Sequence, residues 1–298
     1  SFFRRKQMFQ HLRANHGIKA MIRKHQPFRI TELKDHILIL EIFIAPICKG
    51  QDIKYAPINL DSIYNGNNGT FVLYDYSKND YKVYNYDQAA TDFPVHSTSK
   101  IFWSIIGLEE NIVKSENEIV KWDSIKYPRK NLFDAAWASD QTIVTALHKS
   151  VNWYYYELLS SVTPETAGRY LIKLKYRPDY KIEHVHYQGF ANTVKKSALE
   201  QIVFLIDLYQ NNFKISDKTL EIIKKGLIYQ SNDKYTIYAK TGLGPIDNEN
   251  LIGWFIGFVE KGNKVFFFAA NVENKSLQDA KSLSIDCALK SLMSLGII

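Results

Sequence analysis

Runs of aromatic and β-branched residues predict strands near both ends of the chain. Residues 70–76 and 81–86 are two such runs, and the polar stretch 77–80 between them predicts a hairpin turn. Residues 251–260 and 264–272 form a second pair around a glycine-containing turn. Both ends of the chain are therefore expected to supply strands to one sheet.

Between these strands, apolar residues recur at the spacing of one helical face. In residues 97–110, Ile101, Ile105 and Leu108 fall on the same side of a helix. Strands from both ends around a helical middle predict an α/β domain of the α+β type. We expect a mainly antiparallel sheet flanked by helices, a helical subdomain, and the active site in the cleft between them. Further helices are expected over residues 139–160, 199–210, 217–226 and 277–292.

The N-terminal part of the chain differs from the rest in charge. Residues 1–36 hold nine basic and two acidic residues, which accounts for the net charge of +7 of the whole chain. A basic stretch confined to one end favours a solvated or membrane-facing arm over a nucleic-acid-binding surface. The apolar run 37–48 follows, interrupted by Glu41 and Pro46, and is shorter than the ~20 residues of a membrane-spanning helix. The length of this run favours a helix or strand packed in the core, and a remnant membrane anchor is the alternative.

Residues 49–69 are polar and rich in turn formers, which predicts a linker. We therefore expect an N-terminal arm, apolar segment and linker over residues 1–64, and the main domain over residues 65–298. The chain begins with Ser rather than Met, so a fragment or a processed form of a longer protein is expected.

The composition is that of an ordinary globular protein. The 298 residues are 46% hydrophobic and 23% charged, which suffices for a sizeable core and excludes a disordered or fibrous chain. Cys48 and Cys287 lie far apart and belong to no metal-binding motif, so no metal site is expected.

Ser97-Thr-Ser-Lys100 is the first candidate for chemistry. Residues three apart on a helix share a face, so Lys100 can lie beside the Ser97 hydroxyl. A desolvated lysine can take the serine proton and activate the hydroxyl as a nucleophile. Taken alone, the pattern is a weak signal and favours an ordinary N-cap serine with a solvated lysine.

Two further short patterns follow along the chain. Lys240-Thr-Gly242 closes a strand-like stretch, where a lysine and a threonine hydroxyl can hold a carboxylate beside a glycine that permits close approach. Ser150-Val-Asn152 places a hydroxyl and an amide in a helical stretch. Each alone is a weak signal.

The order S-x-x-K, S-x-N, K-T-G is far more specific. It resembles the signature of the penicillin-recognising serine acyl-enzymes, and the surrounding sequence resembles class D β-lactamases. It resembles still more closely the extracellular sensor domain of the β-lactam sensor-transducers of Gram-positive bacteria. The resemblance covers about residues 65–298 and implies the β-lactamase and penicillin-binding transpeptidase fold. The stretches that carry it are residues 69–75, 97–102, 106–109, 149–154, 199–201 and 240–257.

The resemblance implies a role for each motif residue. Ser97 is the acylated nucleophile, and Lys100 is its general base, as a free amine or as a lysine carboxylated by CO₂. Ser150 relays protons to the leaving nitrogen, and Lys240 helps to hold the substrate carboxylate. No metal and no cofactor other than this CO₂ are implied. The residues implied to contact the substrate are Asn152, Thr241, Gly242 and Leu243, with the backbone N–H groups of Ser97 and Leu243 forming an oxyanion hole.

Three departures bear on the choice between sensor and hydrolase. Asn152 stands where class D hydrolases usually carry an apolar residue and where the sensors carry asparagine. Residues 176–178 read Tyr-Arg-Pro in place of the expected Tyr-Gly-Asn, and proline supplies no N–H. No tryptophan stands near residues 188–190, where the hydrolases place one beside the carboxylated lysine. Trp137 and Trp153 are expected to be core aromatics.

Three functions are compared. The leading one is a β-lactam sensor domain that is acylated at Ser97, deacylates slowly, and reports the antibiotic at the extracellular face of the cell membrane. Its expected partners are β-lactams and an upstream membrane or protease domain of a longer transducer, without nucleic acid. The alternative is a secreted class D-like β-lactamase, and the third is a binding module that has lost the chemistry.

Overall fold

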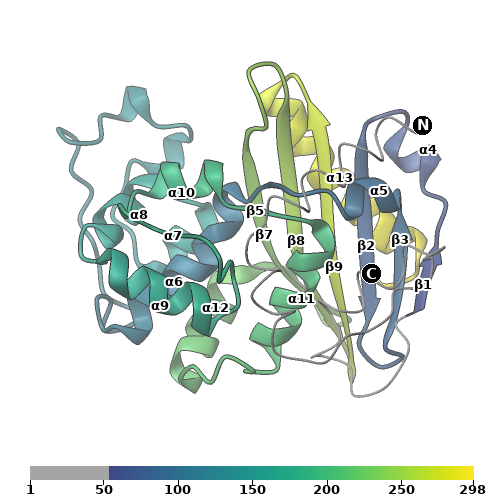
Figure 1. The fold of residues 1–298 in the computed structure, drawn as a ribbon, viewed down its shortest axis with the longest axis horizontal. Coiled ribbons are helices and arrows are strands. Elements are labelled where there is room, and N and C mark those ends of the chain that lie inside the picture. The colour runs from purple at the N-terminus through teal and green to yellow at the C-terminus, as the bar shows by residue number, and fades with distance from the viewer. Residues whose placement is uncertain (1–53) are drawn as a thin grey trace, which may run out of the picture. The chain divides into compact units, whose positions relative to one another are not determined.

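The computed structural model describes residues 54–298, and its centre is a seven-stranded sheet (Figure 1). The strand order is β1-β3-β2-β9-β8-β7-β6, and the neighbours pair antiparallel except for the parallel pair β1 and β3. The strands are β1 (Lys54–Pro57), β2 (Gly69–Asp75), β3 (Asp80–Tyr84), β6 (Ile228–Ser231), β7 (Thr236–Pro245), β8 (Leu251–Lys261) and β9 (Lys264–Asn274).

The two predicted hairpins are confirmed. β2 pairs with β3, and β8 pairs with β9 across a two-residue loop in which Gly262 has a φ of 59°. That left-handed conformation suits glycine and matches the twist of a tight hairpin. Because β2 also pairs with β9, strands from both ends of the chain lie side by side in the middle of the sheet.

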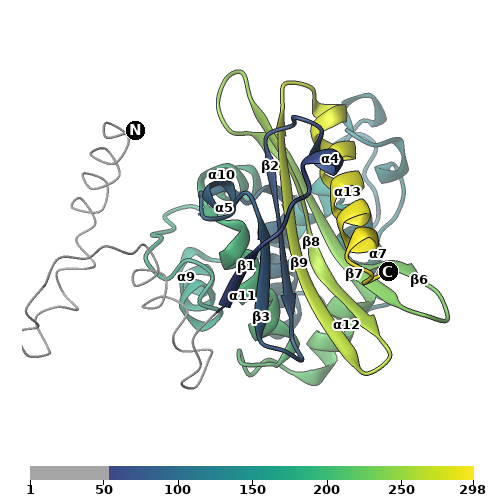
Figure 2. The ribbon, with the colours of Figure 1, turned by 90° about the vertical axis from the view of Figure 1, so that its right-hand side faces the viewer.

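Helices cover both faces of the sheet (Figure 2). Helix α13 (Leu277–Ser294) packs on β7, β8 and β9, and α11 (Ala198–Tyr209) packs on the opposite face against β2, β8 and β9. A Cβ at Gly253 would lie 1.8 Å from the carbonyl oxygen of Ala280, so glycine is required for this close approach of α13. The core under α13 includes Phe71, Phe255, Phe268, Cys287 and Leu292.

A helical subdomain lies beside the β7 side of the sheet (Figure 1). Its first helix is preceded by the 3₁₀ helix His96–Ser99, and the predicted helix at 97–110 is thereby confirmed. The helices of this part are α6 (Lys100–Glu109), α7 (Ile143–Lys149), α8 (Asn152–Leu159), α9 (Pro164–Lys173), α10 (Tyr187–Thr193) and α12 (Asp217–Leu227). The remaining elements are α4 (Asp61–Tyr64), α5 (Tyr86–Ala89), the short pair β4 (Phe93–Pro94) and β5 (Lys195–Lys196), and 3₁₀ turns at Arg129–Asn131 and Ala135–Trp137.

Two predicted boundaries are corrected by the structure. Part of the predicted linker is ordered: β1 pairs with β3 and α4 contacts α13, so residues 54–64 belong to the folded domain. The single helix predicted over 139–160 is two helices, α7 and α8, because Ser150 ends α7 in a left-handed conformation.

The K-T-G motif also lies differently from the prediction. It falls inside β7 rather than at the end of a strand, because pairing with β8 continues to Pro245. The basic arm 1–36 and the apolar run 37–48 lie outside the described residues. Among residues 54–298, no helix has both the length and the apolar character needed to cross a membrane.

Candidate active site

The nucleophile candidate lies where the 3₁₀ helix passes into α6. Ser97 is in the 3₁₀ helix and Lys100 is the first residue of α6, which brings the Lys100 Nζ within 3.2 Å of the Ser97 Oγ. Ser97 is partly exposed, whereas Lys100 is fully buried. The hydroxyl is therefore accessible to a ligand while the amine beside it is shielded from water.

Lys100 is held by acceptors from a second segment. Its Nζ donates to the Ser150 carbonyl oxygen at 2.6 Å and to the Asn152 Oδ1 at 2.6 Å, and lies 3.1 Å from the Ser150 Oγ. Burial, and next the charge of Lys240, lower the pKa of Lys100 well below its ordinary value. A neutral amine has two N–H groups and one lone pair. With both N–H groups on the carbonyl and amide oxygens, the lone pair is left for a hydroxyl proton.

Ser150 depends on an unusual backbone conformation. Its φ of 60° and ψ of 39° are left-handed, which is uncommon for a residue other than glycine and is often found at functional sites. The turn ends α7 and directs both the carbonyl oxygen and the hydroxyl of Ser150 toward Lys100. The break between α7 and α8, which the periodicity did not predict, therefore builds the site.

Lys240 reaches the same hydroxyl from the sheet. Its Nζ donates to the Ser150 Oγ at 2.9 Å and to the Thr241 carbonyl oxygen at 3.1 Å. Only 2% of this residue is exposed, and burial, followed by the charge of Lys281, lowers the pKa of Lys240 to about 7. The four predicted catalytic residues Ser97, Lys100, Ser150 and Lys240 thus form one continuous chain of polar contacts.

The edge of β7 lies against the 3₁₀ helix. β6 pairs only with residues 236–238, so within residues 54–298 no strand pairs with the rest of β7 on that side. A Cβ at Gly242 would lie 3.1 Å from the Thr98 Cγ2, and one at Gly244 would lie 2.4 Å from the His96 ring. Thr98 and His96, the neighbours of Ser97, therefore pack on Gly242 and Gly244, the neighbours of Leu243. This places the predicted oxyanion pair, Ser97 and Leu243, opposite each other.

His96 is a residue that the sequence did not single out. It has a φ of 44°, it is 3% exposed, and its Nε2 has no hydrogen-bond partner among the described residues. Burial lowers the pKa of His96 to about 4, although contacts with the Asn192 side chain and the Pro245 carbonyl oppose this shift. The imidazole is therefore neutral at pH 7 and acts as a packing group between the nucleophile turn and β7.

Aromatic rings surround Lys100. Its Nζ lies 5.7 Å from the ring centre of Trp137, 5.3 Å from that of Tyr155 and 4.9 Å from that of Tyr187. Trp137 and Trp153 are both buried, as expected, but Trp137 also forms part of this enclosure.

Tyr187 touches the nucleophile directly: its Oη lies 3.1 Å from the Ser97 Oγ. Sequence reasoning missed it. The available signal was its position one residue before the stretch 188–190, where a tryptophan had been expected.

The Tyr-Arg-Pro departure has a structural role. Arg177 forms ion pairs with Asp92 at 2.7 Å and with Glu200 at 3.3 Å, and the Tyr176 ring stacks on Phe102 at 4.7 Å. These contacts tie the segment before the 3₁₀ helix to α11.

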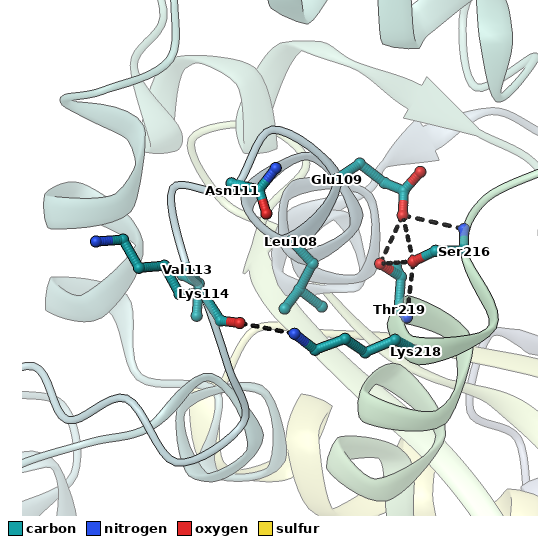
Figure 3. A pocket seen from close by; sticks show the side chains of 8 residues that line it. All are labelled: Leu108, Glu109, Asn111, Val113, Lys114, Ser216, Lys218 and Thr219. Atoms are coloured by element: carbon teal, nitrogen blue, oxygen red, sulfur yellow. Dashed lines mark hydrogen bonds between the residues drawn. The ribbon is translucent and has the colours of Figure 1, made fainter.

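Two hollows lie near the helices. One, of about 240 Å³, lies where α6 ends and α12 begins (Figure 3); there Glu109 accepts hydrogen bonds from the Ser216 N–H and from the Ser216 and Thr219 hydroxyls. These hydrogen bonds fix the start of α12 and occupy the Glu109 carboxylate. The other, of about 250 Å³, adjoins the site because Tyr187 and Tyr156 line it together with Leu159, Ser160, Val185 and His186.

Comparisons with known proteins give relatives of two kinds. Regulatory protein BlaR1 of Staphylococcus aureus is 29% identical over 220 residues, which are 74% of this chain and 37% of that protein. The probable β-lactamase YbxI of Bacillus subtilis is 28% identical over 238 residues, covering 80% of this chain and 86% of the other. The chain thus spans little more than a third of the length of its BlaR1 relative.

Solved structures give the same two groups. The C-terminal domain of the Bacillus licheniformis BlaR penicillin-receptor superposes with a TM-score of 0.72 at 26% identity, covering 83% of this chain and 99% of that one. A class D β-lactamase from Sebaldella termitidis gives a TM-score of 0.75 at 30% identity, covering 83% and 100%. The predicted fold class is therefore confirmed. Residues 63–293 match the family described as penicillin binding protein transpeptidase domain, and the chain belongs to that family.

Proposed function

We propose that this domain is a β-lactam sensor that is acylated at Ser97 and releases the acyl group slowly. The observation that carries the proposal is the contact chain from Ser97 through Lys100 and Ser150 to Lys240. It joins a partly exposed nucleophile to a buried amine of lowered pKa, which is the arrangement that activates a serine hydroxyl.

In the acylation step, Lys100 takes the proton of the Ser97 hydroxyl as Oγ bonds to the lactam carbonyl carbon. The negative charge on the carbonyl oxygen is stabilised by the backbone N–H groups of Ser97 and Leu243. The lactam C–N bond then breaks, and the proton passes from Lys100 through the Ser150 hydroxyl to the leaving nitrogen. Lys240 and Thr241, with Gly242 allowing close approach, hold the carboxylate of the antibiotic, and Asn152 borders the substrate.

Slow deacylation follows from the partners of Lys100. Hydrolysis needs a base that activates water beside the ester. A carbamate on Lys100 would bring its negative oxygens beside the Asn152 Oδ1 and the Ser150 carbonyl, which are both acceptors. We therefore propose that Lys100 works as the free amine and carries no CO₂-derived carboxylate.

The second candidate is a class D-like β-lactamase. It is favoured by the full-length match to the Sebaldella termitidis enzyme and by the same four polar side chains. Turnover would require water to reach the acyl group near Lys100. The binding-module alternative is disfavoured because the contact chain is intact.

The setting of the domain is also a proposal. The penicillin-receptor relative is a C-terminal domain, and the chain covers 37% of BlaR1. We propose that this domain works at the extracellular face of the cell membrane, downstream of a membrane or protease domain, with β-lactams as ligands and no nucleic acid.

Intact-protein mass spectrometry after mixing with excess benzylpenicillin tests this function, with bicarbonate present and sampling from seconds to hours. We expect one added penicillin mass that lasts for hours in the wild type and is absent in Ser97→Ala. An adduct that vanishes while hydrolysed penicillin accumulates would establish the β-lactamase instead. No adduct would refute both acyl-enzyme functions.

A further inference from the structure

Tyr187 is placed to take part in the chemistry as well as in the packing. It is 3% exposed, its ring packs against Tyr155 and Tyr156 with ring centres 5.9 Å apart in each case, and its hydroxyl lies 3.1 Å from the Ser97 Oγ. The ring contacts fix the side chain, so the position of the hydroxyl beside the reacting oxygen is set by the core.

The direction of the hydrogen bond between Tyr187 and Ser97 follows from proton counting. Ser97 has one hydroxyl proton, and Lys100 must receive it for the serine to become nucleophilic. The Ser97 Oγ can then only accept from Tyr187, so the phenol must donate. Burial raises the pKa of Tyr187 above its ordinary value, so the phenol keeps its proton at pH 7.

The same hydroxyl also occupies space that water would need. A hydrolytic water must lie near Lys100 and close to the carbon that Ser97 Oγ carries in the adduct. Tyr187 borders both groups, with its ring 4.9 Å from the Lys100 Nζ and its hydroxyl beside the Oγ. Trp137 and Tyr155 close other sides of the amine.

We propose that Tyr187 is a catalytic residue that donates a hydrogen bond to the Ser97 Oγ to direct it during acylation and then keeps hydrolytic water away from the ester. This inference rests on the proposed sensor function and assigns its slow deacylation to a particular side chain. No bond to Tyr187 forms or breaks, because its proton stays on the phenol oxygen throughout.

Tyr187→Phe removes the hydroxyl and keeps the ring contacts. We expect the rate constant of acylation by benzylpenicillin at saturation to fall about tenfold, as for the loss of one hydrogen bond to the nucleophile. The dissociation constant of the noncovalent complex stays unchanged because the hydroxyl contacts Oγ rather than the carboxylate site. The half-life of the adduct becomes several-fold shorter as water enters the space of the lost oxygen.

Tyr180→Phe is the matched control. Its hydroxyl bonds to the Thr193 Oγ1 at 3.0 Å on the same helix α10, away from Ser97. Stopped-flow acylation and the time course of adduct mass are measured for the three proteins, with circular dichroism as a check on folding.

A Tyr187→Phe protein that acylates at the wild-type rate, or whose adduct lasts as long as that of the wild type, would overturn the role of Tyr187 while leaving the sensor function standing. A control that slows equally would also overturn it, because the effect would then be general to α10. A wild-type adduct that vanishes within minutes would instead overturn the sensor function, and the assigned role of Tyr187 in persistence with it.

Discussion

Replacing Gly244 by alanine should damage the domain through one identifiable contact. The added Cβ would lie 2.4 Å from both Cε1 and Nδ1 of the His96 ring and 2.9 Å from its Nε2. Non-bonded carbon atoms prefer separations of about 3.5–4.0 Å, so the ring or the strand must move by about 1 Å. The ring is buried, which leaves it little room to yield.

The expected cost of Gly244→Ala is about 1–3 kcal/mol of unfolding free energy, the usual range for overpacking a filled site. His96→Ala leaves a cavity and is destabilising in its own right, but it keeps a Cβ at the left-handed position and removes the obstructing ring. In that background Gly244→Ala should cost close to nothing. The two substitutions should therefore be coupled by about 1–3 kcal/mol.

Urea unfolding measures this coupling when the wild type, both single variants and the double variant are compared. The measurement is made at pH 7.5, where His96 is neutral. The acylation rate should fall in the same variants that lose stability, because His96 directly precedes Ser97 and a displaced His96 ring shifts the 3₁₀ helix that holds Ser97. Additivity of the two substitutions within about 0.5 kcal/mol would refute the contact as the cause.

Further outcomes are expected from Lys240 and Asn152. Because the folded-state pKa of Lys240 is about 7, below its ordinary value of 10.5, the charge that holds the antibiotic carboxylate is lost as pH rises through 7, and the acylation efficiency should fall there. Lys240→Arg, which stays charged, should move that fall to higher pH. The unfolded state binds the extra proton between pH 7 and 10.5, so the free energy of unfolding of the wild type should rise with pH in that window. Asn152→Val removes an acceptor from Lys100, so ¹³C-bicarbonate should give a carbamate NMR signal in this variant that is weaker in the wild type; equal signals would contradict the proposed free amine.

Local sequence signals predicted the regular elements well, because β2, β8 and β9 are largely buried and rich in aromatic and β-branched residues, and β3 alternates between buried and partly exposed residues. They did not predict the break at Ser150, since serine has no intrinsic preference for a left-handed conformation and tertiary contacts with Lys100 and Lys240 accompany it there. The strand β1 was missed because four polar-flanked residues form a strand only where β3 offers an edge.

The motif order brought out Ser97, Lys100, Ser150 and Lys240, but their surroundings could not be derived from it. Tyr187 and Trp137 reach the site from separate segments, and no spacing rule connects either of them with Ser97. His96 was overlooked for a different reason. Its neighbours in the sequence belong to the motif, but its role depends on Gly244, which lies 148 positions further along the chain.

The two buried lysines share one hydroxyl, and this determines where protons can lie. Ser150 has a single proton and stands 3.1 Å from the Lys100 Nζ and 2.9 Å from the Lys240 Nζ. If both amines were charged, the hydroxyl could only accept from each, and two like charges would lie together in a site shielded from water. Burial lowers the pKa of Lys240 to about 7, and burial followed by the charge of Lys240 lowers the pKa of Lys100 well below its ordinary value, so the favoured state charges Lys240 and leaves Lys100 neutral. The Ser150 hydroxyl then accepts from Lys240, while the single lone pair of Lys100 is kept for the Ser97 hydroxyl. When Lys100 takes the Ser97 proton, its new third N–H can donate to the Ser150 Oγ, and a proton passes through this hydroxyl to the leaving nitrogen without any side chain changing its place.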